Sequence, residues 1–150
     1  MVDHASLYDV SHHLKYAEDI AVSRKSRLTP IRRHIYSCLV KSDTPLGAYE
    51  ILDMLDGIGS SMPPTVYRTL DWLIEVGLAK KIESVSKYIA RTSSKDSPQM
   101  ALLLCEICGH AEPFDAGSAF KSLGSFAKSK GFQENQTVIE VIGQCAEHRL

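Results

Sequence analysis

The sequence predicts an α+β protein built from a mainly helical unit, residues 1–91, and a small α/β unit, residues 99–150. Up to Gly77, apolar residues recur at intervals of three and four, which is the spacing of amphipathic helices. Residues 92–98 form a polar, turn-rich stretch without periodicity, which is typical of a linker. After it, short β-type runs accompany a single helical segment, and cysteines stand at the spacing of metal ligands.

Two helices are expected in the first part of the helical unit. The first has its apolar residues on one face, at Leu7, Val10, Leu14, Ala17 and Ile20. The second begins where Thr29 precedes Pro30, because threonine caps a helix N-terminus and proline fits the first helical position. Its apolar positions are Ile31, Ile35 and Cys38, and we interpret Cys38 as a core residue.

Two further helices and a hairpin are expected before the linker. The third helix has its apolar face at Ala48, Ile51, Leu52 and Leu55. The fourth begins at Pro63 and stops at Gly77, and its expected inward-facing residues are Val66, Leu70, Leu73 and Ile74. Strand-like runs at residues 78–83 and 87–91 are separated by a short turn, which predicts a β-hairpin.

Helices followed by a two-stranded hairpin are the element order of a winged helix-turn-helix, in which a recognition helix enters the major groove and the hairpin is the wing. The fourth helix would be the recognition helix. Thr65 is expected to bond phosphate, Tyr67 to bond phosphate or contact a thymine methyl group, and Arg68 to reach guanine. The residues predicted at the DNA interface are Arg27, Thr29, Arg32, Pro64, Thr65, Tyr67, Arg68 and Lys81. The alternative is that Tyr67 and Arg68 are ordinary surface residues of a capped helix.

The net charge of −1 does not by itself indicate a nucleic-acid partner. Basic residues are nevertheless concentrated between residues 24 and 41, where no aspartate or glutamate occurs. They are Arg24, Lys25, Arg27, Arg32, Arg33 and Lys41. Such a cluster predicts a phosphate-binding face, with a solvated surface as the alternative.

Two ligand pairs near the C-terminus predict a metal site. Cys105 and Cys108 form a C-x-x-C pair, and Cys145 and His148 form a C-x-x-H pair 37 residues after Cys108. Three cysteines and one histidine make a closed tetrahedral set, which indicates one structural Zn²⁺ rather than catalytic zinc. A redox pair is an alternative interpretation of the C-x-x-C turn. A disulfide set is disfavoured because the chain does not open with a secretory signal, so we expect a reducing cytoplasm.

The unit after the linker is predicted to be too small to be stable alone. Strands are expected at residues 100–104, 111–114 and 137–142, and a helix at residues 117–130 has Phe120, Leu123, Phe126 and Ala127 on one face. A unit of this size needs a metal or a partner subunit, and a sheet of so few strands leaves its edges open. We therefore predict a homodimer formed through the last strand and this helix.

Several motifs together resemble a known family. They are Arg27-Leu28-Thr29-Pro30 with Arg32, Ala48-Tyr49-Glu50-Ile51-Leu52, Pro64-Thr65-Val66-Tyr67-Arg68, and Cys105-x-x-Cys108-Gly109. In this order and spacing, the chain from about residue 14 onward resembles the ferric-uptake-regulator family, and Pro63-Pro64 with Lys81-Ile82-Glu83-Ser84 is most similar to its zinc-uptake-regulator branch. The resemblance implies a dimeric, metal-dependent bacterial repressor with an N-terminal winged helix and a C-terminal dimerisation domain. It also implies Cys105, Cys108, Cys145 and His148 as structural zinc ligands, with His148 in place of the usual fourth cysteine.

The chain departs from that branch at the hinge, where the resemblance implies a metal-sensing site. The branch's hairpin histidine falls at Lys80, its second-strand cysteine at Arg91 and its linker histidine at about Pro98. None of these three residues binds zinc well. The candidate replacement ligands are Glu83, His110 and Glu112, with His12 and His13 on the first helix, and each is also typical of an ordinary surface.

The function predicted from the sequence is a sequence-specific transcriptional repressor that binds palindromic operators as a homodimer. Metal sensing is poorly supported. One alternative is a protein-interaction module of the same fold that has lost regulation, and another is a thiol-redox sensor that uses Cys105 and Cys108. We predict no enzymatic activity, no membrane association and no small-molecule substrate, because no apolar run reaches membrane-spanning length and no catalytic constellation appears.

Overall fold

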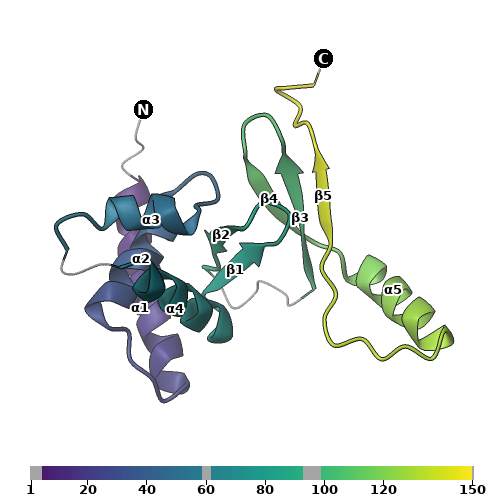
Figure 1. Ribbon diagram of the computed structural model, residues 1–150, viewed down its shortest axis with the longest axis horizontal. Helices are drawn as coiled ribbons and strands as arrows, with labels where there is room; N and C mark the ends of the chain where they lie inside the picture. The colour runs from purple at the N-terminus through teal and green to yellow at the C-terminus, as the bar shows by residue number, and fades with distance from the viewer. Residues whose placement is uncertain (1–4, 59–61, 93–98, 150) are drawn as a thin grey trace. The chain divides into compact units, whose positions relative to one another are not determined.

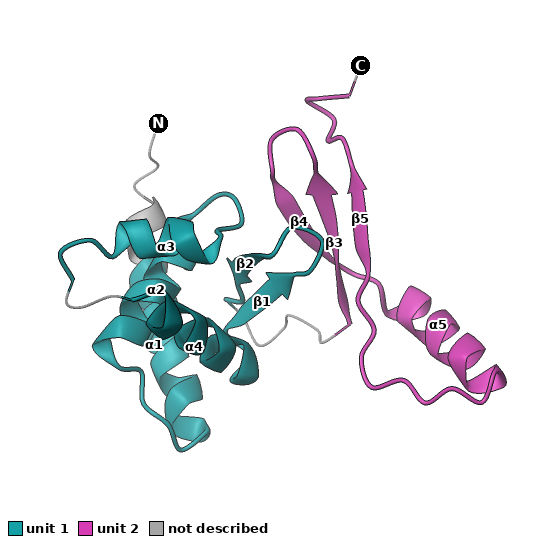
Figure 2. Cartoon of the chain, in the orientation of Figure 1, with its two compact units in different colours: residues 1–93 teal, residues 94–150 magenta. Residues whose placement is uncertain are grey.

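A computed structural model describes residues 5–58, 62–92 and 99–149, and the side chains from Val10 onward within these ranges. The chain divides into two compact units, Met1–Ser93 and Ser94–Leu150 (Figure 2). None of the described helices is both long and apolar enough to cross a membrane. The side chain of Leu7 and residues 93–98 of the predicted linker lie outside what the structure describes.

The first unit contains the four predicted helices, labelled in Figure 1: α1 (Ala5–Ser23), α2 (Pro30–Lys41), α3 (Ala48–Met54) and α4 (Pro63–Glu75). Thr29 is the N-cap of α2, as predicted, and its hydroxyl oxygen accepts the Arg32 N–H at 3.5 Å. Gly77 follows the C-cap of α4 with a φ of +82°, a conformation that glycine adopts without a side-chain clash. Proline at the start and glycine at the end therefore define α4.

The wing is the hairpin of β1 (Ala79–Ile82) and β2 (Lys87–Ala90), which pair antiparallel. Leu46, in the loop before α3, forms an isolated bridge with Tyr88, because each N–H donates to the other residue's carbonyl oxygen at 3.0 and 2.8 Å. The loop thereby adds backbone pairing to the edge of the hairpin, which attaches the wing to the helices.

The core of the first unit lies between the helices and the hairpin. Its fully buried residues include Ala17, Ile35, Tyr36, Ile51, Leu55, Val66, Leu70, Leu73 and Leu78. Cys38 is half-buried and packs against this cluster, as predicted. The prediction for Ile74 was wrong, since 37% of it is exposed. Val66, Leu70 and Leu73 share one helical face, and Ile74 lies at the edge of that face, where it is partly open to solvent.

The second unit is a three-stranded sheet with one helix. The elements are β3 (Met100–Cys105), β4 (Ala111–Asp115), α5 (Gly117–Ser129) and β5 (Glu140–Gly143), and the strand order is β4-β3-β5. β3 pairs antiparallel with β4 and parallel with β5. The last strand was predicted to begin at residue 137, which is wrong: the Thr137 hydroxyl bonds the Glu134 carboxylate at 2.7 Å, and pairing with β3 begins at Glu140.

Candidate nucleic-acid interface and metal centre

The first two turns of α4 have polar side chains on their exposed face. Pro64, Tyr67 and Arg68 are exposed, and Thr65 is half-buried. The Arg68 Nε–H donates to the Pro64 carbonyl oxygen at 3.3 Å, so the guanidinium lies over the start of the helix. Because α4 buries Val66, Leu70 and Leu73, its opposite face is free of core packing. This face is available for contact with a groove.

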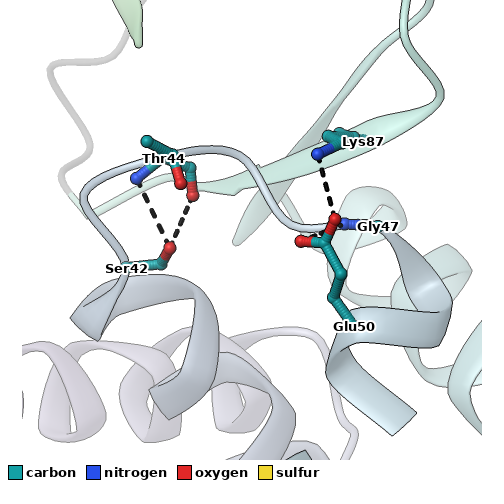
Figure 3. A network of polar contacts seen from close by, with 5 residues as sticks. All are labelled: Ser42, Thr44, Gly47, Glu50 and Lys87. Atoms are coloured by element: carbon teal, nitrogen blue, oxygen red, sulfur yellow. Dashed lines mark hydrogen bonds and ion pairs between the residues drawn. The ribbon is translucent and has the colours of Figure 1, made fainter. Parts of the chain in front are cut away.

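The wing is attached to α3 by contacts that sequence reasoning missed (Figure 3). The Glu50 carboxylate accepts the Gly47 N–H at 3.4 Å at the start of α3 and pairs with Lys87 Nζ of β2 at 3.0 Å. In the preceding loop, the Ser42 hydroxyl donates to the Thr44 carbonyl oxygen at 2.6 Å. A glutamate three residues after the N-cap was the available signal, because it is the position that reaches back to cap a helix. Its second partner, Lys87, had no such signal.

Arg32 lies inside a local cluster, although it was predicted at the DNA backbone. Its guanidinium carbon lies 3.9 Å from the centre of the Trp72 ring, and Nη1 donates to the Arg27 carbonyl oxygen at 2.7 Å. The hydroxyl oxygen of Ser26 accepts from Arg32 Nη1 at 3.3 Å and from Trp72 Nε1 at 3.1 Å. Through Ser26 and Arg32, the turn between α1 and α2 is bonded to Trp72 of α4. The turn also exposes Arg27.

Replacing Arg32 by alanine is expected to destabilise the first unit by about 2–3 kcal/mol. The loss combines a cation–π contact of about 1 kcal/mol with hydrogen bonds to a charged donor. Its neighbour Arg33 offers a matched control, because its guanidinium forms an exposed ion pair with Glu18 at 3.0 Å, worth less than about 1 kcal/mol. Urea unfolding of the two variants measures the difference. Equal losses for both variants would contradict the role of the Trp72 contact.

The two metal-ligand pairs meet because two parallel strands end together. β3 ends at Cys105, which pairs in register with Gly143 at the end of β5. Each strand leads into a tight turn, closed by the Gly109 N–H bonding the Cys105 carbonyl oxygen and the His148 N–H bonding that of Cys145, both at 2.9 Å. The second ligand of each pair is thereby turned back towards the first.

The four side chains have the geometry of a tetrahedral metal site. The ligand atoms of Cys105, Cys108, Cys145 and His148 all lie within 4.8 Å of one another. The Cys108 and Cys145 sulfurs are 4.0 Å apart, and the Cys145 sulfur lies 3.0 Å from His148 Nδ1. A tetrahedral zinc with bonds of 2.3 Å to sulfur separates its ligands by about 3.7 Å. The donor set and its spacing therefore fit zinc.

Hydrogen bonds prepare one of these thiols to bind a cation. Backbone N–H groups of Cys108 and Cys145 point at the Cys105 sulfur and lower the pKa of that thiol to about 6. Burial, together with the neighbouring Cys105 and Cys108 sulfurs, raises the pKa of the Cys145 thiol. Since the thiolate is the form that binds metal, Cys105 needs less help from the ion to lose its proton than Cys145 does.

A family model, described as the ferric uptake regulator family, matches residues 23–142, which is most of the chain. The chain belongs to the ferric uptake regulator family. The family match includes the recognition helix, the wing and the first cysteine pair, and it ends before Cys145 and His148.

Similar proteins place the chain near zinc regulators of that family. The zinc uptake regulation protein of Escherichia coli (strain K12) is 33% identical over 135 residues, which cover 89% of this chain and 79% of that protein. A solved zinc uptake regulator complexed with zinc and DNA matches with a TM-score of 0.87 and 31% identity, covering 92% of this chain and 93% of that one. The crystal structure of holo XcZur matches with a TM-score of 0.80 and 32% identity, and the match covers 89% of this chain and 94% of that one.

The other candidate metal ligands, Glu83, His110, Glu112, His12 and His13, do not form a second cluster of three or more donors among the described residues. In the part of the chain that the structure describes, the cluster at Cys105 is the one group of three or more such donors. His110 and Glu112 are exposed beside it and line a groove with Leu103 and Val141. In the first unit, Glu83 pairs with Lys81 at 3.5 Å. His12 is exposed and His13 half-buried on α1, with their ring centres 5.9 Å apart.

Proposed function

We propose that this member of the ferric uptake regulator family is a sequence-specific transcriptional repressor that binds palindromic DNA as a homodimer. The observation that supports it best is the exposed face of the first two turns of α4, beside a wing attached at both Leu46 and Glu50. A helix N-terminus presented in this way meets base edges in winged helix-turn-helix proteins. The likeness to a zinc uptake regulator complexed with DNA supports the same function.

The residues of α4 and the wing take distinct roles in this proposal. Arg68 would bond a guanine edge, Tyr67 a thymine methyl group or phosphate, and Thr65 a phosphate, with the Pro64 backbone close to the groove. Arg27 and Lys81, both on the same unit, would hold the DNA backbone. Arg32 and Thr29 also bond the turn and the N-cap before α2, and their contact with the DNA backbone stays a prediction.

One zinc ion per chain would be held by Cys105, Cys108, Cys145 and His148. The ion supplies a cross-link between the ends of β3 and β5, and with four protein ligands it leaves no open position for substrate chemistry. This arrangement favours a structural role over the thiol-redox alternative, since zinc-bound thiolates are committed to the metal. The number of bound ions is measurable by metal analysis of the purified protein.

The second unit supports self-association through α5 and β5. α5 has no buried residue, and Leu123 and Phe126 are 48% and 64% exposed. Val141 and Ile142 of β5 are exposed as well. β5 and β4 are the two edges of the sheet, but Pro113 removes one N–H donor from β4. β5 is therefore the edge better suited to face a second copy.

The Arg68→Ala variant tests the DNA assignment. Enrichment of random duplexes by the natural protein should yield an inverted repeat, because a twofold dimer reads two equal half-sites. On that duplex, Arg68→Ala should weaken binding by about 1–3 kcal/mol and relax specificity at one position in each half-site. Lys15→Ala on α1 is the matched control, since it removes one exposed positive charge that belongs neither to the predicted DNA interface nor to the proposed dimer interface. Quantitative band-shift titration at fixed salt measures both variants.

Two outcomes would contradict the proposal. If no duplex is enriched, the chain is better described as a protein-interaction module of the same fold. If Arg68→Ala and Lys15→Ala weaken binding equally, the recognition surface lies elsewhere than the first two turns of α4.

A further inference from the structure

The region where the zinc-uptake branch places its sensing ligands has almost no metal donors in this chain. Between Glu83 and Cys105, the sequence contains no histidine, no cysteine and a single carboxylate, Asp96. Asp96 lies outside the described residues. The two positions on the wing that correspond to ligands are instead occupied by cations, Lys80 and Arg91. A regulatory metal at this place does not fit the donors that are present.

Both cations are built into the hairpin. Lys80 is in β1 and pairs in register with Ile89 of β2, and Arg91 directly follows β2. The Arg91 N–H donates to the Leu78 carbonyl oxygen at 2.8 Å, and the Arg91 carbonyl oxygen accepts from the Tyr36 hydroxyl at 3.0 Å. Lys80 and Arg91 are each half-buried. Their backbones are therefore fixed, and neither position can be vacated by a simple loop movement.

The Arg91 guanidinium lies at the C-terminal end of the recognition helix. A Cβ added to Gly77, the residue after the α4 C-cap, would lie 3.9 Å from Arg91 Nη1. The C-terminus of a helix has a partial negative charge, so a cation at this position is stabilising. Arg91 thus places a permanent positive charge between the end of α4 and the wing. A guanidinium remains protonated at any physiological pH and has no lone pair for a metal.

We infer that this chain has no regulatory metal site on its wing and binds DNA with its structural zinc as the only metal. The inference rests on the proposed DNA-binding function for its second part. A divalent ion at the wing would meet the charges of Lys80 and Arg91 and find no neutral nitrogen or thiolate. A ligand shifts a conformational equilibrium only through its different affinities for the two states, so without a site zinc cannot raise DNA affinity.

Metal stoichiometry tests the first part without DNA. Protein that retains its structural zinc is dialysed against buffered Zn²⁺, and separately against Mn²⁺ or Fe²⁺ under anaerobic conditions, and then analysed for metal. The expected result is one zinc per chain at every buffered concentration. A second tightly held ion per chain would overturn the inference, whatever the protein does with DNA.

Affinity for the enriched duplex tests the second part. With structural zinc verified in each sample, affinity should change by less than about twofold as buffered zinc rises, whereas a metal-activated repressor changes by at least about fivefold. A rise of that size would overturn the inference. A complete failure to bind any duplex would instead refute the proposed function, and the stoichiometry would still decide whether a second metal site exists.

A triple variant tests whether the lost donors are the cause. Lys80→His and Arg91→Cys, combined with Pro98→His, place three donors where the zinc-uptake branch has them, and the variant should raise zinc content above one per chain. The matched control is Lys80→Gln, Arg91→Gln and Pro98→Gln, which removes both charges without adding a strong donor and should stay at one. A triple variant that keeps its fold and structural zinc but gains no further zinc would overturn the assignment of these positions.

Discussion

Replacing Cys105 by serine is expected to remove zinc from the protein and unfold the unit at residues 94–150. This unit has few buried side chains, because α5 has none and the sheet contributes mainly β3 residues such as Ala101 and Leu102. So small a core does not offset the conformational entropy of its chain. Structural zinc contributes on the order of 10 kcal/mol in small zinc-binding peptides, which exceeds the stability that such a unit could have alone. The variant should therefore show one thermal transition, that of the helical unit.

The fourth cysteine provides the control for this experiment. Cys38 lies in α2 and belongs to no metal cluster among the described residues, so Cys38→Ala should keep one zinc per chain. His148→Ala should lower zinc affinity less than Cys105→Ser, because water can fill a fourth position. Metal analysis and differential scanning calorimetry measure both effects. A Cys105→Ser protein with full zinc content and both thermal transitions intact would show that the cluster is not structural.

Acidification should release the same ion. The pKa of the Cys105 thiol is lowered to about 6 from an ordinary value of 9.0, so its thiolate form is present above that pKa. A lowered pKa in the folded state means that the stabilisation is lost as pH falls through the folded value. The pKa of the Cys145 thiol is raised instead, so protons compete with zinc for Cys145 at higher pH and for Cys105 only as pH falls towards about 6.

A feature of this fold can be predicted from the sequence when the residues that determine it lie close together along the chain. The bounds of α4 follow from Pro63 and Gly77, which act within one helical turn, and the prediction and the structure agree there. The start of β5 is different, because it depends on where β3 begins to pair in parallel, about 40 residues earlier. Local propensity at Thr137 indicates a strand, but tertiary pairing decides its start.

The candidate site shows the same division. The metal cluster can be predicted from the sequence because each turn supplies two ligands three residues apart, and two such turns supply all four ligands. The partners of Arg32 are not evident, since its ring partner Trp72 is 40 residues away and Ser26 joins the two only in the folded state. From the sequence alone, a basic residue in such a cluster is predicted to contact DNA phosphates. Its contacts within the protein become visible only in the folded structure. The pairing of Glu50 with Lys87 across 37 residues was missed for the same reason.

The Val141→Asp variant is expected to convert the homodimer into a monomer that keeps its zinc. Val141 is 50% exposed in one chain, and its register partner Leu103 on β3 is 44% exposed, so together they present an apolar face beside the sheet edge. Placing an unpaired carboxylate in a buried interface costs about 3–5 kcal/mol, which raises the dissociation constant of the dimer at least about a hundredfold. Sedimentation equilibrium at micromolar concentration measures this change.

Val22→Asp is the matched control, because it makes the same substitution at a residue that is 70% exposed on α1 in the other unit. It should leave the association constant unchanged. Because a palindromic duplex is bound through two linked half-sites, the monomeric variant should also lose most of its affinity for that duplex, although Arg68 and Tyr67 are untouched. A Val141→Asp protein that stays dimeric would place the twofold interface away from β5. A natural chain that is monomeric at micromolar concentration with zinc bound would remove the basis for a palindromic operator.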